Sequence, residues 1–120
     1  MAHILLVEDE PDTRYALAQV LSNAGHDIVE ADSAADAAPL LEEQDFDLLI
    51  CELQLAHDQA AAILERASRQ IPRLGVIGIC GGGLARSAHH IAAAKAAGAV
   101  AILHKPFDSE TLVAAAERLS

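Results

Sequence analysis

Five short apolar runs, separated by stretches of helical length, constrain the fold of this sequence most strongly. The clearest run, Asp47-Leu48-Leu49-Ile50-Cys51-Glu52, ends in a carboxylate. An apolar run of this length is typical of a strand that is buried on both faces of a parallel sheet. The strands are predicted at His3–Val7, Asp27–Ala31, Phe46–Cys51, Leu74–Cys80 (broken by Gly78) and Ala99–Leu103.

The stretches between these runs predict five helices. Pro11 and Gly25 suit the start and the end of the first helix. Ser33 with Asp36 resembles a capping box for the second helix, and Pro39 predicts that this helix is kinked or starts late. The other helices are predicted at Gln59–Gln70 (ended by Pro72), at Arg86–Ala97 (after the loop Gly81–Gly83 and closed by Gly98), and from the cap Asp108 to Leu119.

Strict alternation of strands and helices indicates an α/β domain with a parallel sheet and helices on both faces. Right-handed crossovers leave few topologies, and the strand order 2-1-3-4-5 is one common solution for five strands. The length of 120 residues suits a single domain, 1–120, and no linker or repeat divides it.

Composition narrows the possible functions. The net charge is −10, which argues against direct binding of nucleic acid or of an anionic membrane. The N-terminus lacks the features of a signal peptide, and no stretch approaches a membrane span. The two cysteines, Cys51 and Cys80, both lie in apolar runs. We therefore expect reduced thiols in a cytoplasmic protein.

Polar residues follow three of the predicted strands. Glu8-Asp9-Glu10 comes after the first run, Glu52 ends the third, and His104-Lys105-Pro106 comes after the fifth. The carboxyl ends of parallel strands meet at one edge of a sheet, which is where open α/β sheets bind ligands. The sequence therefore predicts that carboxylates and a lysine converge on one rim.

These motifs resemble a response-regulator receiver domain of bacterial two-component signalling. The resemblance rests on Ile4–Glu10 (first strand and acidic pair), Asp47–Leu53 (third strand) and Gly98–Phe107 (fifth strand and Lys-Pro motif), and it spans the whole chain in order and spacing. It implies a doubly wound (βα)5 flavodoxin-like three-layer sandwich.

The resemblance also implies roles at the rim. In that family an aspartate ending the third strand accepts a phosphoryl group from a histidine kinase, and the matching position here is Glu52. The Mg²⁺ ligands would be Glu8, Asp9, Glu52 and the backbone carbonyl of Gln54, and Lys105 would neutralise the phosphoryl charge.

Three positions depart from the family pattern. Glu52 replaces aspartate, Cys80 stands where threonine or serine is expected, and Ile102 stands at the aromatic switch position. Glutamate is one methylene longer, and reaction geometry is sensitive at roughly 1 Å. A thiol is a weak hydrogen-bond donor, and isoleucine cannot make the aromatic swing. The longer carboxylate can instead reach Lys105 and partly imitate the phosphorylated state.

We therefore expect a degenerate receiver in phosphorelay signalling that acts as a phosphorylation-independent protein-interaction module and is not an enzyme. Its partner would be a histidine kinase, a phosphotransfer protein or an output protein, bound by the fourth helix, fifth strand and fifth helix as in the family. The alternative is a receiver that still takes a phosphoryl group from a histidine kinase with Mg²⁺. A flavin-binding domain is disfavoured, because only Tyr15, Phe46 and Phe107 are aromatic.

The simpler interpretations remain open for individual residues. Glu8, Asp9 and Glu52 form either a remnant Mg²⁺ site, which we favour, or a solvated acidic edge; we expect Mg²⁺ to bind weakly or not at all. Cys51 should point away from Glu52 into the core. The strand-end position of Cys80 leaves its exposure open. His57 and His104 lie near the rim and are treated as surface histidines.

Overall fold

The computed structural model describes residues 1–56, 59–70, 74–82, 84–99 and 101–120. Three residues discussed above, His57, Pro72 and Gly83, lie outside this part. The elements alternate as predicted: β1 (His3–Val7), α1 (Pro11–Asn23), β2 (Asp27–Ala31), α2 (Ala34–Glu43), β3 (Leu48–Glu52), α3 (Ala60–Ser68), β4 (Gly75–Cys80), α4 (Leu84–Ala96), β5 (Ala101–His104) and α5 (Ser109–Leu119).

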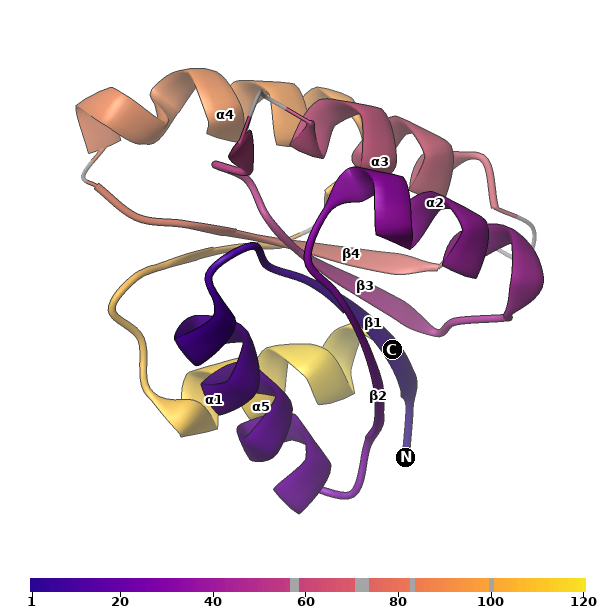
Figure 1. Ribbon diagram of the computed structural model, residues 1–120. Coiled ribbons are helices and arrows are strands. Elements are labelled where there is room, and N and C mark those ends of the chain that lie inside the picture. The colour runs from indigo at the N-terminus through magenta and orange to yellow at the C-terminus, as the bar shows by residue number, and fades with distance from the viewer. Residues whose placement is uncertain (57–58, 71–73, 83, 100) are drawn as a thin grey trace.

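The five strands form one parallel sheet in the order β2-β1-β3-β4-β5, which confirms the predicted topology. Helices α2, α3 and α4 lie on one face of the sheet, and α1 and α5 lie on the other (Figure 1). The result is a three-layer sandwich with β3 in the middle strand position. In the described part of the chain, no helix is long and apolar enough to cross a membrane.

Two hydrophobic clusters, one on each face, hold the layers together. Side chains alternate along a strand, so Ile4, Leu6, Leu48 and Ile50 face α1 and α5. Their neighbours Leu5, Val7, Leu49 and Cys51 face α2 and α3. All five residues of β3 are buried, which explains why its sequence reads as an unbroken apolar run.

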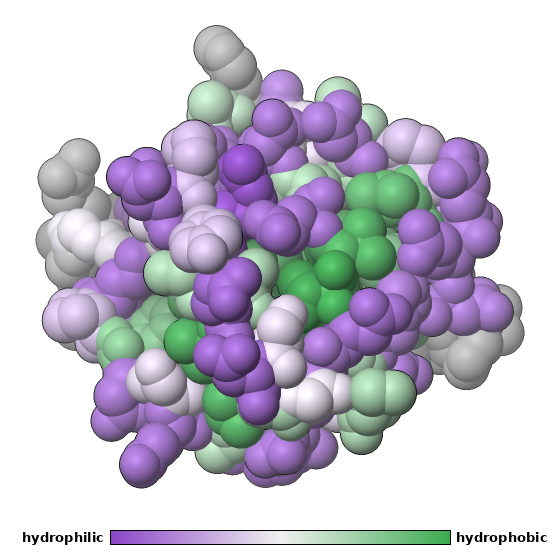
Figure 2. Space-filling view, turned by 60° about the horizontal axis from the view of Figure 1, so that its bottom comes forward, coloured by the Kyte–Doolittle hydropathy of each residue, from purple (hydrophilic) through white to green (hydrophobic). Residues whose placement is uncertain are grey.

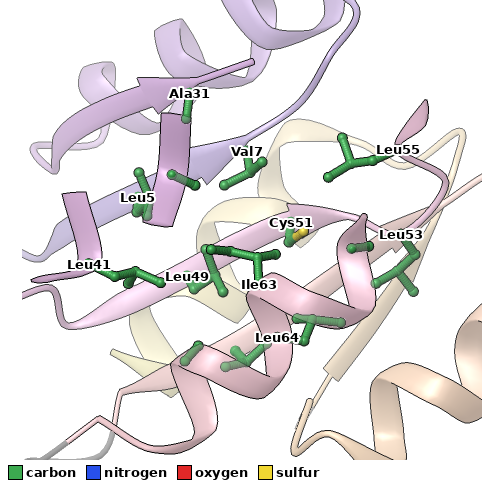
Figure 3. Packing of buried hydrophobic residues seen from close by; sticks show 14 of the residues in the cluster. Leu5, Val7, Ala31, Leu41, Leu49, Cys51, Leu53, Leu55, Ile63 and Leu64 are labelled. Atoms are coloured by element: carbon green, nitrogen blue, oxygen red, sulfur yellow. The ribbon is translucent and has the colours of Figure 1, made fainter. Parts of the chain in front are cut away.

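The cluster under α3 can be followed in Figure 3. Leu49 and Cys51 of β3 are directed toward Ile63 and Leu64 of α3, and Leu53 lies beyond the end of the strand in the same cluster. Cys51 is fully buried, as predicted, and burial raises the pKa of its thiol well above its ordinary value. It is therefore a small core residue and not a reactive thiol.

Local signals set most helix ends as predicted. The Ser33 hydroxyl accepts a hydrogen bond from the Asp36 N–H (3.1 Å), and the Asp108 carboxylate accepts one from the Thr111 N–H (2.8 Å). Gly25 and Gly98 follow α1 and α4 with φ of 95° and 103°, a backbone conformation that favours glycine.

Pro39 was predicted to kink the second helix or to delay its start, and the second of these alternatives is wrong. Helix α2 begins at Ala34 and runs through Pro39. Its first turn is capped by Ser33, and Ala37 and Leu41 on its inner face are buried, which outweighs the hydrogen bond lost at proline.

The other wrong prediction concerns Gly78, which does not break β4. It pairs with Cys51 on one side and Ile102 on the other. The side chain of Leu53 fills the space where a Cβ would lie, about 2.8 Å from its nearest methyl carbon. The glycine is needed for close packing and not for a turn.

Some element limits also differ from the prediction. The central strand covers Leu48–Glu52 and not Phe46–Cys51, so Glu52 belongs to the strand. Helix α4 begins at Leu84 and not at Arg86, while β4 begins at Gly75 and β5 covers Ala101–His104. Strand pairing sets the limits of the three strands, and pairing is not visible in the local sequence.

Gly75→Ala should destabilise the domain, because a Cβ at this position would overlap the backbone carbonyl of Leu119 at the end of α5. We expect a loss of about 1–3 kcal/mol, the usual cost of overpacking, in the free energy of unfolding measured with urea. The matched control is Gly81→Ala, whose Cβ would meet its nearest neighbour, Lys105, at an ordinary 3.6 Å. Equal losses in the two variants would contradict the packing argument.

Candidate functional site

The carboxyl ends of β1, β3 and β5 bring three charged side chains together. Glu8 follows β1, Glu52 is the last residue of β3, and Lys105 follows β5. Strand β1 pairs directly with β3, whereas β5 is separated from β3 by β4. The long side chain of Lys105 spans this gap, so that residues 53 and 97 positions apart in the sequence are in contact.

The Lys105 amino group bridges the two carboxylates. Its Nζ lies 3.2 Å from Glu8 Oε1 and 3.2 Å from Glu52 Oε1. The Glu8 and Glu52 residues are only 2% and 7% exposed, whereas the Lys105 side chain is 31% exposed. Two buried negative charges therefore share one positive charge at the edge of the sheet.

The second carboxylate oxygens differ in their surroundings. Glu8 Oε2 accepts a hydrogen bond from the backbone N–H of Glu10 (3.1 Å). Glu52 Oε2 is buried and has no hydrogen-bond partner in the part of the chain that the structure describes. When the Glu52 carboxylate is ionised, this oxygen therefore loses its hydration without gaining a hydrogen bond from the described residues.

The pKa directions follow from this arrangement. Burial raises the pKa of Glu52; the charge of Lys105 opposes the shift without cancelling it, and the charge of Glu8 adds to it. Burial likewise raises the pKa of Glu8, against the Glu10 N–H and Lys105. Burial alone would lower the pKa of Lys105, but Glu52 and Glu8 outweigh it and the pKa is raised. The lysine therefore stays charged while both carboxyl groups are held less acidic than usual.

The other predicted metal ligands lie outside this bridge. Asp9 is exposed, and its Oδ2 accepts a long hydrogen bond (3.4 Å) from the Ala56 N–H. The Gln54 side chain accepts a hydrogen bond from the Gly81 N–H (3.1 Å), which ties the loop after β3 to the loop after β4.

The Lys105 amino group contacts two of the residues that were expected to bind Mg²⁺, Glu8 and Glu52. Carboxylate oxygens are the donors that Mg²⁺ prefers. However, the single positive charge of the Lys105 amino group is already shared between Glu8 and Glu52. Among residues 1–56, 59–70, 74–82, 84–99 and 101–120, no three or more His, Cys, Asp or Glu residues are grouped so that they could hold a metal ion.

Cys80, whose exposure the sequence left open, is completely buried. Its side chain belongs to the cluster on the α2–α4 face, and its Sγ lies 3.4 Å from Nδ1 of His104, an exposed residue. The β4–β5 register places these two residues opposite each other. Ile102 is partly buried against the same cluster.

Sequence reasoning missed two contacts near the rim. The Arg14 guanidinium donates to the backbone carbonyl of Glu8 (2.9 Å) and pairs with Glu30 (3.4 Å), which fixes the start of α1 beside the site. The Cys80–His104 contact was also missed, because it depends on the register of two strands. The only sequence signal for the Arg14 contacts was the presence of an arginine one turn into the first helix.

Comparison with known proteins identifies the family. Residues 4–117 match the model of the response regulator receiver domain. Two relatives are 32% identical: the response regulator protein FleR of Pseudomonas aeruginosa over 112 residues (93% of this chain, 23% of FleR), and the response regulator receiver protein CpdR of Brucella abortus over 81 residues (68% of each). The crystal structure of the receiver domain of NtrX from Brucella abortus superposes with a TM-score of 0.86 at 30% identity, covering 97% of this chain and 96% of that one.

The chain thus spans about a quarter of the length of FleR and most of an isolated receiver domain. The fold, the order of the elements and the family match cover nearly all of the sequence. This chain belongs to the response regulator receiver domain family of two-component signalling.

Proposed function

We propose that this receiver domain is a protein-interaction module whose signalling state does not depend on phosphorylation at position 52. The observation that carries this proposal is the contact of 3.2 Å between Lys105 Nζ and Glu52 Oε1. In the receiver family, by resemblance, this lysine neutralises the phosphoryl group on the acceptor aspartate. Here the longer carboxylate already supplies a negative charge to the lysine.

The surroundings of Glu52 support the same conclusion. Cys80 offers a weakly donating thiol where the family has a hydroxyl, and this thiol is buried beside His104. Ile102 is an aliphatic residue packed against the core and cannot rotate as an aromatic switch residue does. The domain would therefore present one persistent surface to its partner, and we assign it no enzymatic activity of its own.

The partner in this proposal is another signalling protein: a histidine kinase, a phosphotransfer protein or an output protein. By resemblance to the family, it would bind the surface formed by α4, β5 and α5. FleR is about four times as long as the region that matches this chain. If this domain is part of a longer protein, the activity of that protein is therefore also a matter of proposal.

A second candidate is a receiver that still accepts a phosphoryl group with Mg²⁺. Two observations favour it: Glu52 Oε2 has no hydrogen-bond partner among the described residues, and the Asp9 carboxylate is exposed at the same edge. A ligand at this edge could then bind the Asp9 carboxylate and Glu52 Oε2, although Lys105 would have to release Glu8 or Glu52. The two candidates make opposite predictions for phosphorylation.

Incubation with a small-molecule phosphodonor and Mg²⁺ should leave the mass of the wild-type protein unchanged, because the Glu52 carboxylate is too long for in-line attack and is held by Lys105. Intact-mass spectrometry measures the outcome. The matched variant is Glu52→Asp, which shortens the side chain by one methylene and should gain at least partial labelling. A mass increase of one phosphoryl group in the wild type would establish the second candidate instead.

Titration with Mg²⁺ should produce no saturable amide chemical-shift changes at Glu8, Asp9, Glu52 or Gln54 at millimolar metal, because the lysine occupies the electrostatic position of the cation. Two-dimensional NMR of the wild type gives the result. The control is Asp9→Asn, which removes an exposed carboxylate from the same edge. Saturable shifts in the wild type that disappear in this variant would demonstrate a working metal site.

Acidification should stabilise the wild type relative to Glu52→Gln. Burial raises the pKa of Glu52, so the folded protein binds this proton at a higher pH than the unfolded chain does. The resulting stability is fully present below the ordinary pKa of 4.5 and is lost as the pH rises through the folded-state pKa. We therefore expect the difference in free energy of unfolding to grow in favour of the wild type as the pH falls from neutral toward 4.5.

Urea denaturation at stepped pH measures this difference. Glu43→Gln, which changes an exposed carboxylate on α2, serves as the charge-matched control and should follow the wild-type pH dependence. A difference between wild type and Glu52→Gln that stays constant with pH would contradict the buried-carboxylate argument.

A further inference from the structure

A groove lies between the second half of α1 and the helix α5, on the face of the sheet opposite α3. Its volume is about 490 Å³, and its apolar lining comes from Val20 of α1, from Ala24 directly after α1, and from Val113 and Ala114 of α5. The two alanines are small, so the helices leave a hollow between them. On this side of the molecule, hydrophobic side chains gather within a hydrophilic surround (Figure 2).

The charged residues at the groove are both acidic. Glu110 and Glu117, two turns apart on α5, are exposed and line it, and its remaining polar residues are Asn23 and Ser109. Within the described chain, no Lys, Arg or His lines this groove, and Arg118 is not among its lining residues. The groove therefore combines an apolar centre with a negative rim on a protein whose net charge is −10.

Charge decides between the possible occupants. A symmetric dimer formed through this groove would place the same glutamates of two copies next to each other, on two molecules that each carry −10. A partner with positive charge beside its apolar residues would instead match the rim and be attracted over a longer range. An apolar stripe on a helix is the shape that such a hydrophobic groove accepts.

We propose that the groove between α1 and α5 is a docking surface for an amphipathic helix of a partner protein that carries lysine or arginine beside its apolar stripe. The groove contains none of the rim residues Glu8, Glu52 and Lys105. This interaction is therefore independent of the chemistry at position 52. The groove would be a second binding surface, which shares α5 with the α4–β5–α5 surface proposed above.

The probe for this proposal is a synthetic 18-residue helical peptide with leucines along one face and lysines on the others, compared with the same peptide carrying glutamates in place of the lysines. We expect the lysine peptide to bind the full chain and to shift the amide resonances of α1 and α5, with an affinity that falls as salt is added. The glutamate peptide should not bind. Binding of both peptides, or shifts centred on α4 and β5, would overturn the proposal.

Two pairs of variants separate groove binding from general attraction to an acidic protein. Ala114→Tyr fills the groove without changing the charge and should abolish binding of the lysine peptide, whereas Ala92→Tyr, at an exposed alanine on α4, should not. The double variant Glu110→Gln/Glu117→Gln should weaken binding roughly three- to tenfold, as expected for two exposed ion pairs. The charge-matched control Glu43→Gln/Asp45→Asn, at exposed residues outside the groove, should weaken it less.

Circular dichroism and urea denaturation establish that each variant is folded before binding is measured. Equal weakening by the two charge variants would show non-specific attraction and overturn the proposal. So would concentration-dependent dimerisation of the wild type in analytical ultracentrifugation that is lost in Ala114→Tyr, because the occupant would then be a second copy of this chain.

Discussion

The pairing of β3 with a strand on each side is the constraint on which the rest of this domain depends. Its five residues are all buried, and its side chains divide between the two hydrophobic clusters that hold the helical layers. Because β3 is in the middle of the sheet, its last residue lies at the centre of the carboxyl edge, between the ends of β1 and β4. A side chain there is largely removed from water whatever its charge.

That position gives the site its electrostatic character. Glu52 and Glu8 are buried carboxylates, and Lys105 is the one cation that contacts both in the described structure. Removing a carboxylate from water is costly, and a shared lysine compensates only in part, as the raised pKa of both groups indicates. A site built in this way favours retention of the lysine at Glu52, which is the physical basis of the proposed phosphorylation-independent state.

The rim at the carboxyl edge and the groove between α1 and α5 are built in different ways. The rim chemistry involves loops at the carboxyl edge, whereas the groove between α1 and α5 results from two small side chains, Ala24 after α1 and Ala114 on α5. A receiver whose rim is held in one state can therefore still have more than one surface for partners. The rim and the groove consist of separate residues, although α5 belongs to both proposed partner surfaces, and each proposal can fail without the other.

Much of the fold could be predicted because its signals are local. Ser33 and Asp108 cap their helices, and Gly25 and Gly98 end theirs, through contacts within a few residues. Where a local signal competed with tertiary packing, the prediction failed. Gly78 was predicted to interrupt β4, but it pairs on both sides because Leu53 occupies the space above it.

The sequence alone determined the order of the elements, the parallel sheet and the set of charged residues at its edge, because apolar periodicity and strand-end position are properties of short segments. The tertiary structure decided which of these charged residues touch. Lys105 reaches Glu8 and Glu52 across 97 and 53 residues of sequence, Cys80 is buried opposite His104, and Val20 and Val113 line one groove. Such contacts depend on strand register and on how closely helices pack, and both are fixed only when the whole chain is folded.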